Sequence, residues 1–459
     1  MDEQELAAQR RLFGTNGIRG VVGKEMTASF AMEMGCAIGS YFKGEVVIGT
    51  DSRTSNEMLK SAMIAGLAST GCGVTDIGLA PTPSVQYTVL RSESVAGVMI
   101  TASHNPPEFN GIKVVDSDGT ELDFSKELDI EGIYFAKRFR KIDWRSVGSL
   151  QKDPGANLRY AEAIEGCVNR DSIRKAGLGI VLDCANGVAG LVSPRLLSNL
   201  GAKVTVLNAE PDGSFPGHPS EPTPENLVDL MQEVKDEGAS FGVAHDGDAD
   251  RAVFIDEKGG YVTGDKSFAV LAGFVVSKSP GSSVVSTVAT SDCVGDMVAK
   301  NGGRIIMTRV GSPVVARKMK EVGAVFGGEE NGGLIYAKHQ HCRDAAMTTA
   351  LMAELVAERG SLHDLLKEVP IYHQAKLKID CPNERKKEVM EALVETASDK
   401  KVDLTDGVKV FEDGDWVIIR PSGTEPIFRI FSQSKSEGRA GSLAQDYLRR
   451  LERIISGSS

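Results

Sequence analysis

Three aspartates spaced two residues apart are the strongest chemical signal in the sequence. Asp246, Asp248 and Asp250 occur in FGVAHDGDADRAVFID, between two apolar stretches. Alternate residues of an extended loop point the same way, so the three carboxylates can converge on one point. Anionic oxygen ligands suit Mg²⁺, which keeps further positions open for phosphate or water. The alternative is a solvated acidic turn, but three aspartates between apolar strands are costly without a cation.

A serine follows another apolar stretch, in GVMITASHNPPEFNGIKVV. Ser103 stands at the carboxyl end of a predicted strand, where ligands of α/β domains usually bind, although serines there are often only caps or turn residues. His104 as its general base would suggest an acyl-transfer enzyme. However, adjacent side chains on an extended chain point apart, and no G-x-S-x-G motif surrounds the serine. Ser103 with a Mg²⁺ loop therefore favours phosphoryl transfer, and Lys113 could return to the same site from the next strand-like stretch.

A polar turn near the end of the chain has the composition of a phosphate site. It reads RPSGTEPIFRI and lies between two alternating strand-like stretches. Backbone N–H groups, two hydroxyls and arginine side chains can together enclose an anion. A plain β-turn explains the proline, serine and glycine, but not the two arginines and the threonine. The residues of this predicted site are Arg420, Ser422, Gly423, Thr424 and Arg429.

A fourth loop, FGGEENGG, places Glu329 and Asn331 between two pairs of glycines. Glycines let the backbone approach a ligand closely, and a carboxylate there suits bidentate hydrogen bonding to neighbouring sugar hydroxyls. A solvated charged loop is an equal alternative.

The elements that must position these loops follow one recurring order of strand, polar loop, helix, glycine and strand. The order begins at VVIGTD, IVLDCANG and SSVVSTVATS, and the helix-ending glycines are Gly71, Gly201 and Gly302. This βαβ pattern predicts three tandem, related α/β domains with mixed sheets. The tail, with alternating strands and a charged helix over 384–397, predicts a smaller C-terminal α+β domain. The predicted domains are 1–152, 153–257, 258–368 and 369–459.

The composition is that of an ordinary globular protein and disfavours several kinds of partner. The chain has 459 residues, 41% hydrophobic and 25% charged, and a net charge of −11, which disfavours nucleic acid and anionic membranes as partners. Seven scattered cysteines without a CxxC pair suit reduced thiols. The first residues show no signal peptide, and the longest apolar run, 268–276, is too short to span a bilayer. We therefore expect a cytoplasmic protein, and the sequence leaves its oligomeric state open.

Together the motifs FGTNGIRG, TASHNPPEFNGIK, DGDADR, GGEENGG and RPSGTEP resemble, in order and spacing, those of the α-D-phosphohexomutase family, over essentially the whole chain. The family includes phosphoglucomutases, phosphomannomutases and phosphoglucosamine mutases. The resemblance implies four domains around a central cleft. It also implies an isomerase that interconverts hexose 1-phosphate and 6-phosphate through a phosphoserine and a hexose 1,6-bisphosphate. A metal-dependent sugar phosphatase and a catalytically silent phosphosugar-binding protein are the alternatives.

The resemblance also implies a role for each motif. Ser103 becomes the phosphoserine and completes the Mg²⁺ site of the three aspartates, and Lys113 is the best candidate for the general base. Glu329 holds the 3- and 4-hydroxyls of the sugar, and the RPSGTEP loop grips the non-reacting phosphate. The other catalytic or substrate-binding candidates are Arg19, His104, Arg251, Arg309 and Asn331.

Three positions depart from the family pattern. Asn331 and Gly333 stand where many bacterial members carry serine and histidine, and Ser312 stands where some relatives carry histidine. Glucose, mannose and glucosamine share the 3- and 4-hydroxyls, so the glutamate loop does not distinguish them. The motifs RPSGTEP and FGTNGIRG are most similar to phosphoglucosamine mutases and to archaeal-type phosphoglucomutase/phosphomannomutases.

Overall fold

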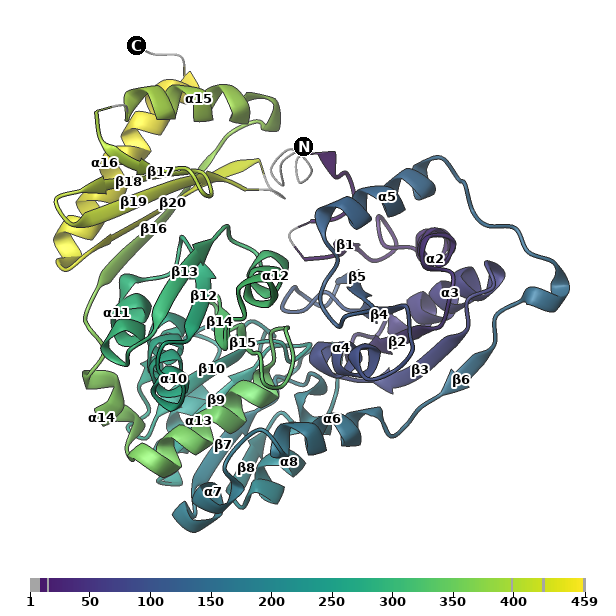
Figure 1. Cartoon of the computed structure of the whole chain (residues 1–459), viewed down its shortest axis with the longest axis horizontal. Helices are drawn as coiled ribbons and strands as arrows, with labels where there is room; N and C mark the ends of the chain where they lie inside the picture. Colours follow the sequence, from purple (N-terminus) through teal and green to yellow (C-terminus); the bar gives the residue numbers. More distant parts are fainter. Residues whose placement is uncertain (1–8, 15, 398, 423–425, 457–459) are drawn as a thin grey trace.

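The computed structural model describes residues 9–14, 16–397, 399–422 and 426–456. The described chain forms four units, each built on its own sheet (Figure 1). Three units have mixed parallel and antiparallel sheets covered by helices, and the fourth has an antiparallel sheet, as the sequence predicts. Gly423 and Thr424 of the predicted phosphate loop lie outside the described residues.

The first unit has a six-stranded sheet in the order β1-β5-β4-β2-β3-β6. Its elements are β1 (Ile18–Val21), α2 (Ala28–Phe42), β2 (Val46–Thr50), α3 (Asn56–Ser69), β3 (Val74–Leu79), α4 (Thr82–Leu90), β4 (Ala96–Ile100), β5 (Phe109–Asp116), α5 (Phe124–Phe135), η1 (Trp144–Ser146) and β6 (Leu150–Lys152).

The second unit has the sheet order β11-β10-β9-β7-β8, and the third has β13-β12-β14-β15. The second contains α6 (Ala156–Glu165), α7 (Arg170–Ala176), β7 (Gly179–Asp183), η2 (Val188–Leu191), α8 (Ser193–Leu200), β8 (Lys203–Leu207), α9 (Val228–Asp236), β9 (Phe241–His245), β10 (Ala252–Asp256) and β11 (Tyr261–Val262). The third contains α10 (Gly264–Lys278), β12 (Ser283–Thr287), α11 (Asp292–Lys300), β13 (Arg304–Thr308), α12 (Ser312–Val322), β14 (Phe326–Gly328), β15 (Leu334–Tyr336), α13 (Ala345–Arg359) and α14 (Leu362–Lys367).

One four-strand arrangement recurs in the three mixed sheets. In the first unit, β3, β2 and β4 are parallel neighbours, and β4 forms an antiparallel hairpin with β5. The same relations join β8, β7, β9 and β10, and again β13, β12, β14 and β15. The hairpin loops hold Ser103, the three aspartates and Glu329 respectively. Three of the predicted site loops therefore occupy the same position in three related units.

Local sequence explains these elements. The strands β2, β4, β9 and β12 are buried along their whole length, as strands covered by helices on both faces must be. The sequences of β2, β4 and β9 are mostly apolar, whereas β12 also contains two serines and a threonine. Glycines mark the helix ends where the sequence places them. Gly71, Gly201 and Gly302 all have positive φ angles, of 86°, 102° and 82°.

The fourth unit has a five-stranded, fully antiparallel sheet in the order β16-β20-β19-β18-β17. Helices α15 and α16 cover one face of the sheet (Figure 1). Trp416 on the other face packs against Val288 of the third unit. Its elements are β16 (His373–Asp380), η3 (Asn383–Arg385), α15 (Lys386–Thr396), β17 (Lys401–Asp403), β18 (Val408–Glu412), β19 (Asp415–Pro421), β20 (Ile427–Ser434) and α16 (Glu437–Ser456). None of the helices in the described part of the chain is long and apolar enough to cross a membrane.

Candidate active site

Ser103 faces the aspartate loop of the second unit. It lies in the β4–β5 loop, is almost fully buried, and its Oγ donates a hydrogen bond to Asp246 Oδ2 at 2.7 Å. Its φ of 52° lies in the left-handed region that side chains other than glycine seldom adopt. The strained backbone at Ser103 thus directs its hydroxyl toward a carboxylate from another unit.

His104 lies closer to Ser103 than the sequence indicated. Its Nδ1 is 3.3 Å from Ser103 Oγ, and its Nε2 is 3.2 Å from Glu221 Oε2. The expectation that these neighbouring side chains point apart is wrong, because it assumed an extended chain and Ser103 is left-handed. Burial lowers the pKa of His104 to about 2, and the cations Arg251 and Arg19 add to this effect. The imidazole is therefore neutral in this arrangement.

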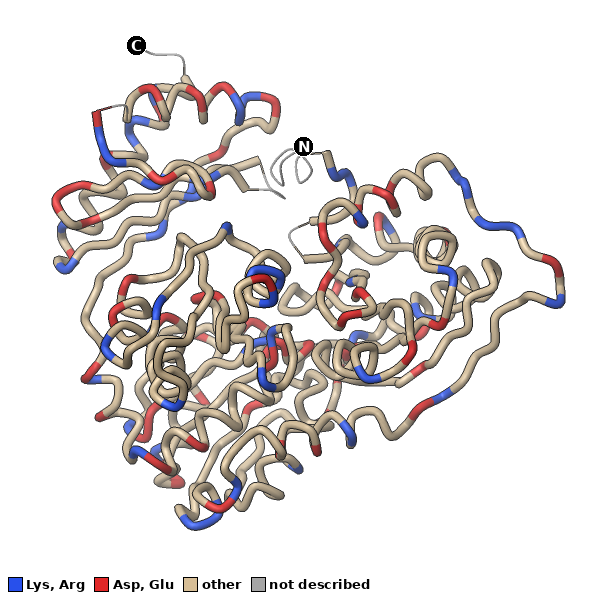
Figure 2. Tube along the Cα trace, in the orientation of Figure 1, with Lys and Arg blue, Asp and Glu red and all other residues tan. Residues whose placement is uncertain are grey.

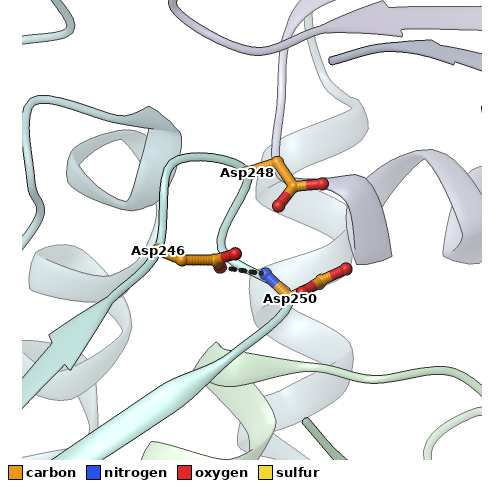
Figure 3. Close-up of side chains that lie close together, drawn as sticks. All are labelled: Asp246, Asp248 and Asp250. Carbon is orange, nitrogen blue, oxygen red and sulfur yellow. Dashed lines mark hydrogen bonds between the residues drawn. The ribbon is translucent and has the colours of Figure 1, made fainter. Parts of the chain in front are cut away.

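The three aspartates converge as predicted (Figure 3). All are buried, and carboxylate oxygens of the three lie within 4.8 Å of one another. The loop is a turn rather than an extended stretch, because Ala249 has a φ of 55° and its N–H donates to the Asp246 carbonyl at 3.0 Å. The Asp250 N–H also donates to Asp246 Oδ1 at 3.2 Å, which fixes the first carboxylate against the third residue.

Two carboxylate oxygens of this cluster indicate that its residues can bind a cation. Asp248 Oδ1 and Asp250 Oδ1 are buried, and neither has a hydrogen-bond partner among the described residues. A buried carboxylate oxygen without a partner is costly, and hard cations such as Mg²⁺ are bound by oxygens of this kind. The donor set therefore fits Mg²⁺.

Cations from three units surround the cluster, and Figure 2 shows acidic and basic positions side by side where these units meet. Lys113 Nζ lies 2.6 Å from Asp248 Oδ2 and 3.0 Å from Asp250 Oδ2, and Arg251 Nη2 lies 3.0 Å from Asp246 Oδ2. Burial alone would lower the pKa of Lys113, but the two carboxylates outweigh it and raise that pKa above its ordinary value. Lys113 is therefore a protonated partner of the aspartates here.

The carboxylates respond differently to these surroundings. Burial raises the pKa of Asp246 to about 7, although Arg251 opposes it. Burial also acts on Asp250, but Arg343 and Lys113 outweigh it and hold the pKa of Asp250 well below its ordinary value. Arg343, whose Nη2 lies 2.5 Å from Asp250 Oδ2, is a site residue that the sequence interpretation missed. The one feature of the sequence that could have indicated Arg343 is its position in a charged pair, Arg343 and Asp344, directly before the apolar helix α13.

Arg19 lies beside the serine loop. It is in β1, and its Nη1 donates to Asn105 Oδ1 at 2.6 Å. Burial is the largest effect on its pKa and lowers it, while Asp248 and Asp250 act in the opposite direction. Arg19 thus contributes positive charge near the aspartates without an ion pair to them within the described residues.

Arg53, which the sequence interpretation also missed, holds the serine loop in shape. Its buried guanidinium donates to four backbone carbonyls of the loop, those of Ser103, Asn105, Pro106 and Phe109. Asp51 Oδ2 lies 3.3 Å from its Nε and also accepts a hydrogen bond from Thr101 at 2.5 Å. Charged residues directly after the buried strand β2 are the signal that could have found this pair.

The predicted sugar loop adjoins the same cluster. Glu329 Oε1 accepts a hydrogen bond from the Gly311 N–H at 3.0 Å, and Glu329 Oε2 lies 3.7 Å from Arg343 Nη1. Burial raises the pKa of Glu329 to about 7, although Arg343 acts against it. Asn331 Oδ1 accepts from the Gly333 N–H at 3.0 Å and so closes its own loop. The half-buried Arg309 has buried Nε and Nη1 atoms without a hydrogen-bond partner among the described residues.

The two arginines of the predicted phosphate loop are direct neighbours. Arg420 in β19 and Arg429 in β20 are register partners, and like charges at such positions repel unless an anion lies between them. The Ser422 N–H donates to the Ile427 carbonyl at 2.9 Å. Arg420 Nε lies 3.1 Å from Asp406 Oδ2, which also accepts from the Val310 N–H at 3.0 Å. Asp406, another missed residue, thereby joins this loop to the loop of Arg309.

The described residues thus gather in two groups. The first joins Ser103, His104, Lys113, Arg251 and the three aspartates, and Arg343 links it to Glu329. The second is the pair Arg420 and Arg429, which reaches the third unit through Asp406.

Comparisons with known proteins cover most of the chain. Four family descriptions match in order: "Phosphoglucomutase/phosphomannomutase, alpha/beta/alpha domain I" over residues 10–141, domain II over 158–260, domain III over 263–372 and the C-terminal domain over 377–450.

Curated relatives match over almost their full length. A phosphoglucomutase/phosphomannomutase of Thermococcus kodakarensis is 44% identical over 97% of this chain and 100% of the relative. A probable phosphoglucosamine mutase of Methanothermobacter thermautotrophicus is 40% identical over 97% of this chain and 98% of the relative. Among solved structures, a phosphoglucomutase/phosphomannomutase family protein of Burkholderia thailandensis superposes with a TM-score of 0.87 and 27% identity, over 98% of each chain.

Proposed function

The chain belongs to the phosphoglucomutase/phosphomannomutase family, and from this membership we propose that it is an isomerase that moves a phosphoryl group between the 1- and 6-positions of a hexose through Ser103. The observation that carries the role of Ser103 is the 2.7 Å hydrogen bond from its Oγ to Asp246, inside a buried cluster of carboxylates and cations. Phosphoryl transfer depends chiefly on positioning and charge stabilisation, which this cluster offers.

Asp246, Asp248, Asp250 and a phosphate oxygen on Ser103 would hold Mg²⁺. When bound there, Mg²⁺ supplies positive charge against the oxygens of the transferred phosphoryl group. The Oδ1 atoms of Asp248 and Asp250, which accept no hydrogen bond within the described residues, support this assignment.

The chain's own side chains have distinct proposed roles in the transfer. A free sugar hydroxyl attacks the phosphorus on Ser103, so a new O–P bond forms while the bond from Ser103 Oγ to phosphorus breaks. The hydroxyl loses a proton and the serine oxygen gains one. Because Lys113 is protonated beside the aspartates, we assign to its Nζ the donation of a proton to the serine oxygen as that bond breaks, and the uptake of the proton that the sugar hydroxyl loses. Arg251, Arg19 and His104 line the transfer site and orient the phosphate, with Arg251 already bound to Asp246.

The resulting hexose 1,6-bisphosphate must turn round before its second phosphate returns to Ser103. Glu329 would hold the 3- and 4-hydroxyls, which are presented in the same way from both directions. Arg309 and Asn331 lie in the loops beside it. The non-reacting phosphate would bind at Arg420, Ser422 and Arg429, together with the sequence-predicted Gly423 and Thr424.

The substrate class is a hexose phosphate, and glucose, mannose and glucosamine phosphates are the candidates. Relatives of near-equal identity have names that cover all three sugars. We propose that the enzyme acts in the cytoplasm on this small substrate rather than on nucleic acid or a membrane. The net charge of −11 and seven free cysteines support this setting.

An isomerisation assay tests the proposal. The purified protein is incubated with Mg²⁺, a glucose 1,6-bisphosphate primer and each of the three sugar 1-phosphates, and both sugar 6-phosphate and free phosphate are measured. We expect the 6-phosphate of at least one sugar to accumulate without stoichiometric phosphate release. Accumulation of free phosphate instead would identify a phosphatase, and no turnover of any of the three sugars would overturn the proposal.

A further inference from the structure

Three cationic side chains stand in one row across the sheet of the fourth unit. Arg420 on β19 is the register partner of Arg429 on β20, and Arg429 is the register partner of Lys378 on the edge strand β16. Directly paired residues of antiparallel strands point to the same face of a sheet. Neighbouring strands lie about 4.8 Å apart, so the long lysine side chain reaches a ligand that the two guanidinium groups hold.

This row lies on the sheet face that is turned toward the third unit. Lys376, two residues before Lys378 and hence on the same face, has its Nζ 4.0 Å from Glu330 Oε1 in the predicted sugar loop. The intervening residue Leu377 packs on the opposite side, in the core beneath α16. Lys378 therefore shares a face with the side chain that reaches the loop of Glu329.

Lys378 has no counter-charge among the described residues. Asp406 contacts Arg420, whereas the exposed Lys378 forms no ion pair with a carboxylate of the described chain. Three adjacent cations repel one another, and a phosphate dianion relieves that repulsion while accepting several charged hydrogen bonds.

We propose that Lys378 is a further substrate-binding residue, which contacts the non-reacting phosphate of the hexose phosphate together with Arg420 and Arg429. This inference rests on the proposed function, because it takes the fourth unit to hold that phosphate. A competing explanation is that Lys378 only protects the open edge of β16 from pairing with another chain, as lysines on edge strands do.

Kinetics of four variants separate these explanations. The variants are K378A, K378R, R420A and the control K401A, which changes an exposed lysine on β17, the opposite edge strand. We expect K378A to raise KM for the hexose 1-phosphate about fivefold to tenfold with kcat within about twofold, because the contact forms in substrate and transition state alike. Inhibition by inorganic phosphate should weaken by a similar factor, while K378R retains most of the binding and K401A behaves as the wild type.

Three outcomes with the same variants would contradict the inference, and each points to a different conclusion. An unchanged KM and phosphate inhibition in K378A, with a raised KM in R420A, would overturn the role of Lys378 and leave the phosphate site standing. Self-association of K378A without any change in KM would assign the residue to edge protection. Unchanged binding in both K378A and R420A would instead remove the phosphate site from the fourth unit, and so contradict that part of the proposed function.

Discussion

Arg343 donates from Nη2 to Asp250 Oδ2 at 2.5 Å, so a cation of the third unit reaches the aspartate loop of the second. Its Nη1 lies 3.7 Å from Glu329 Oε2, and one guanidinium therefore stands between the predicted metal loop and the predicted sugar loop. Burial would lower the pKa of Arg343, but Asp250 and Glu121 outweigh it and raise that pKa above its ordinary value. The guanidinium is thus permanently charged at a position where two carboxylates need a cation.

Replacing Arg343 by alanine should destabilise the protein, because it leaves buried carboxylates without their counter-charge. We expect the free energy of unfolding in EDTA to fall by about 3–5 kcal/mol, and the loss to be smaller with saturating Mg²⁺. Denaturant unfolding in both buffers measures this. Arg170→Ala, which removes an ion pair of an exposed arginine to Glu165, is the control. An R343A loss no larger than that of the control would contradict the prediction.

Removing the hydroxyl of Ser103 should abolish mutase activity while the fold persists. Ser103→Ala loses one hydrogen bond to Asp246 and also the oxygen that accepts the phosphoryl group in the proposed mechanism. We expect kcat to fall at least about a thousandfold, as for other nucleophile deletions, with little change in circular dichroism. Phosphopeptide mass spectrometry of the wild type should find phosphate on Ser103. Retained activity in the alanine variant would exclude the phosphoserine mechanism.

Mg²⁺ should stabilise the folded protein through the aspartate cluster. A ligand that binds only the folded state raises the melting temperature with its concentration. We expect a rise on titrating Mg²⁺ into EDTA-treated wild type, and a much smaller rise in Asp248→Asn. Calorimetric titration gives the binding stoichiometry directly. Asp236→Asn, an exposed aspartate at the end of α9, is the matched control and should respond as the wild type does.

His339 predicts a pH dependence of stability away from the active site. Its Nε2 lies 3.4 Å from Asp344 Oδ2, and its ring stacks on Tyr87 of the first unit. Burial acts to lower the pKa of His339, but Asp344 and Cys167 raise it to about 9. Because the folded pKa exceeds the unfolded value of about 6.5, this stabilisation is complete below pH 6.5 and is lost as pH rises through 9.

The predicted size of that contribution is about 3 kcal/mol. The measurement compares the free energies of unfolding of the wild type and His339→Gln between pH 6 and 9.5. We expect the difference between them to shrink across this window, because other groups that titrate there are common to both proteins. A difference that does not vary with pH would show that the His339–Asp344 pair has no such effect.

The sequence predicts the site residues that lie in loops directly after strands. Asp246, Ser103 and Glu329 could be found in this way because each follows a buried apolar stretch, and the carboxyl ends of such strands are where ligands bind. The three repeated units were predictable for the same reason, since strand, helix and glycine recur locally along the chain.

The residues that were missed have partners far away in the sequence. Arg343 meets Asp250 across 93 residues, Arg53 meets the Ser103 carbonyl across 50, and Glu221 meets Arg251 across 30. Local patterns encode such contacts poorly, because they form only when distant segments of the chain pack together. Arg343 and Asp250 belong to different units, and the other two contacts each lie within one unit. The incorrect expectation for His104 has a different cause. A single left-handed φ at Ser103 reverses the direction of the side chains, and residue type does not reveal it.

The repeated hairpin position has a consequence for how such an enzyme can diversify. Ser103, the three aspartates and Glu329 lie in equivalent hairpin loops of three separate sheets, and each sheet keeps its own buried strands behind the loop. Substitutions in one of these hairpin loops can therefore occur without disturbing the buried strands of the other two sheets. The architecture is modular, so the residues of one hairpin loop can change in evolution while the three sheets are conserved.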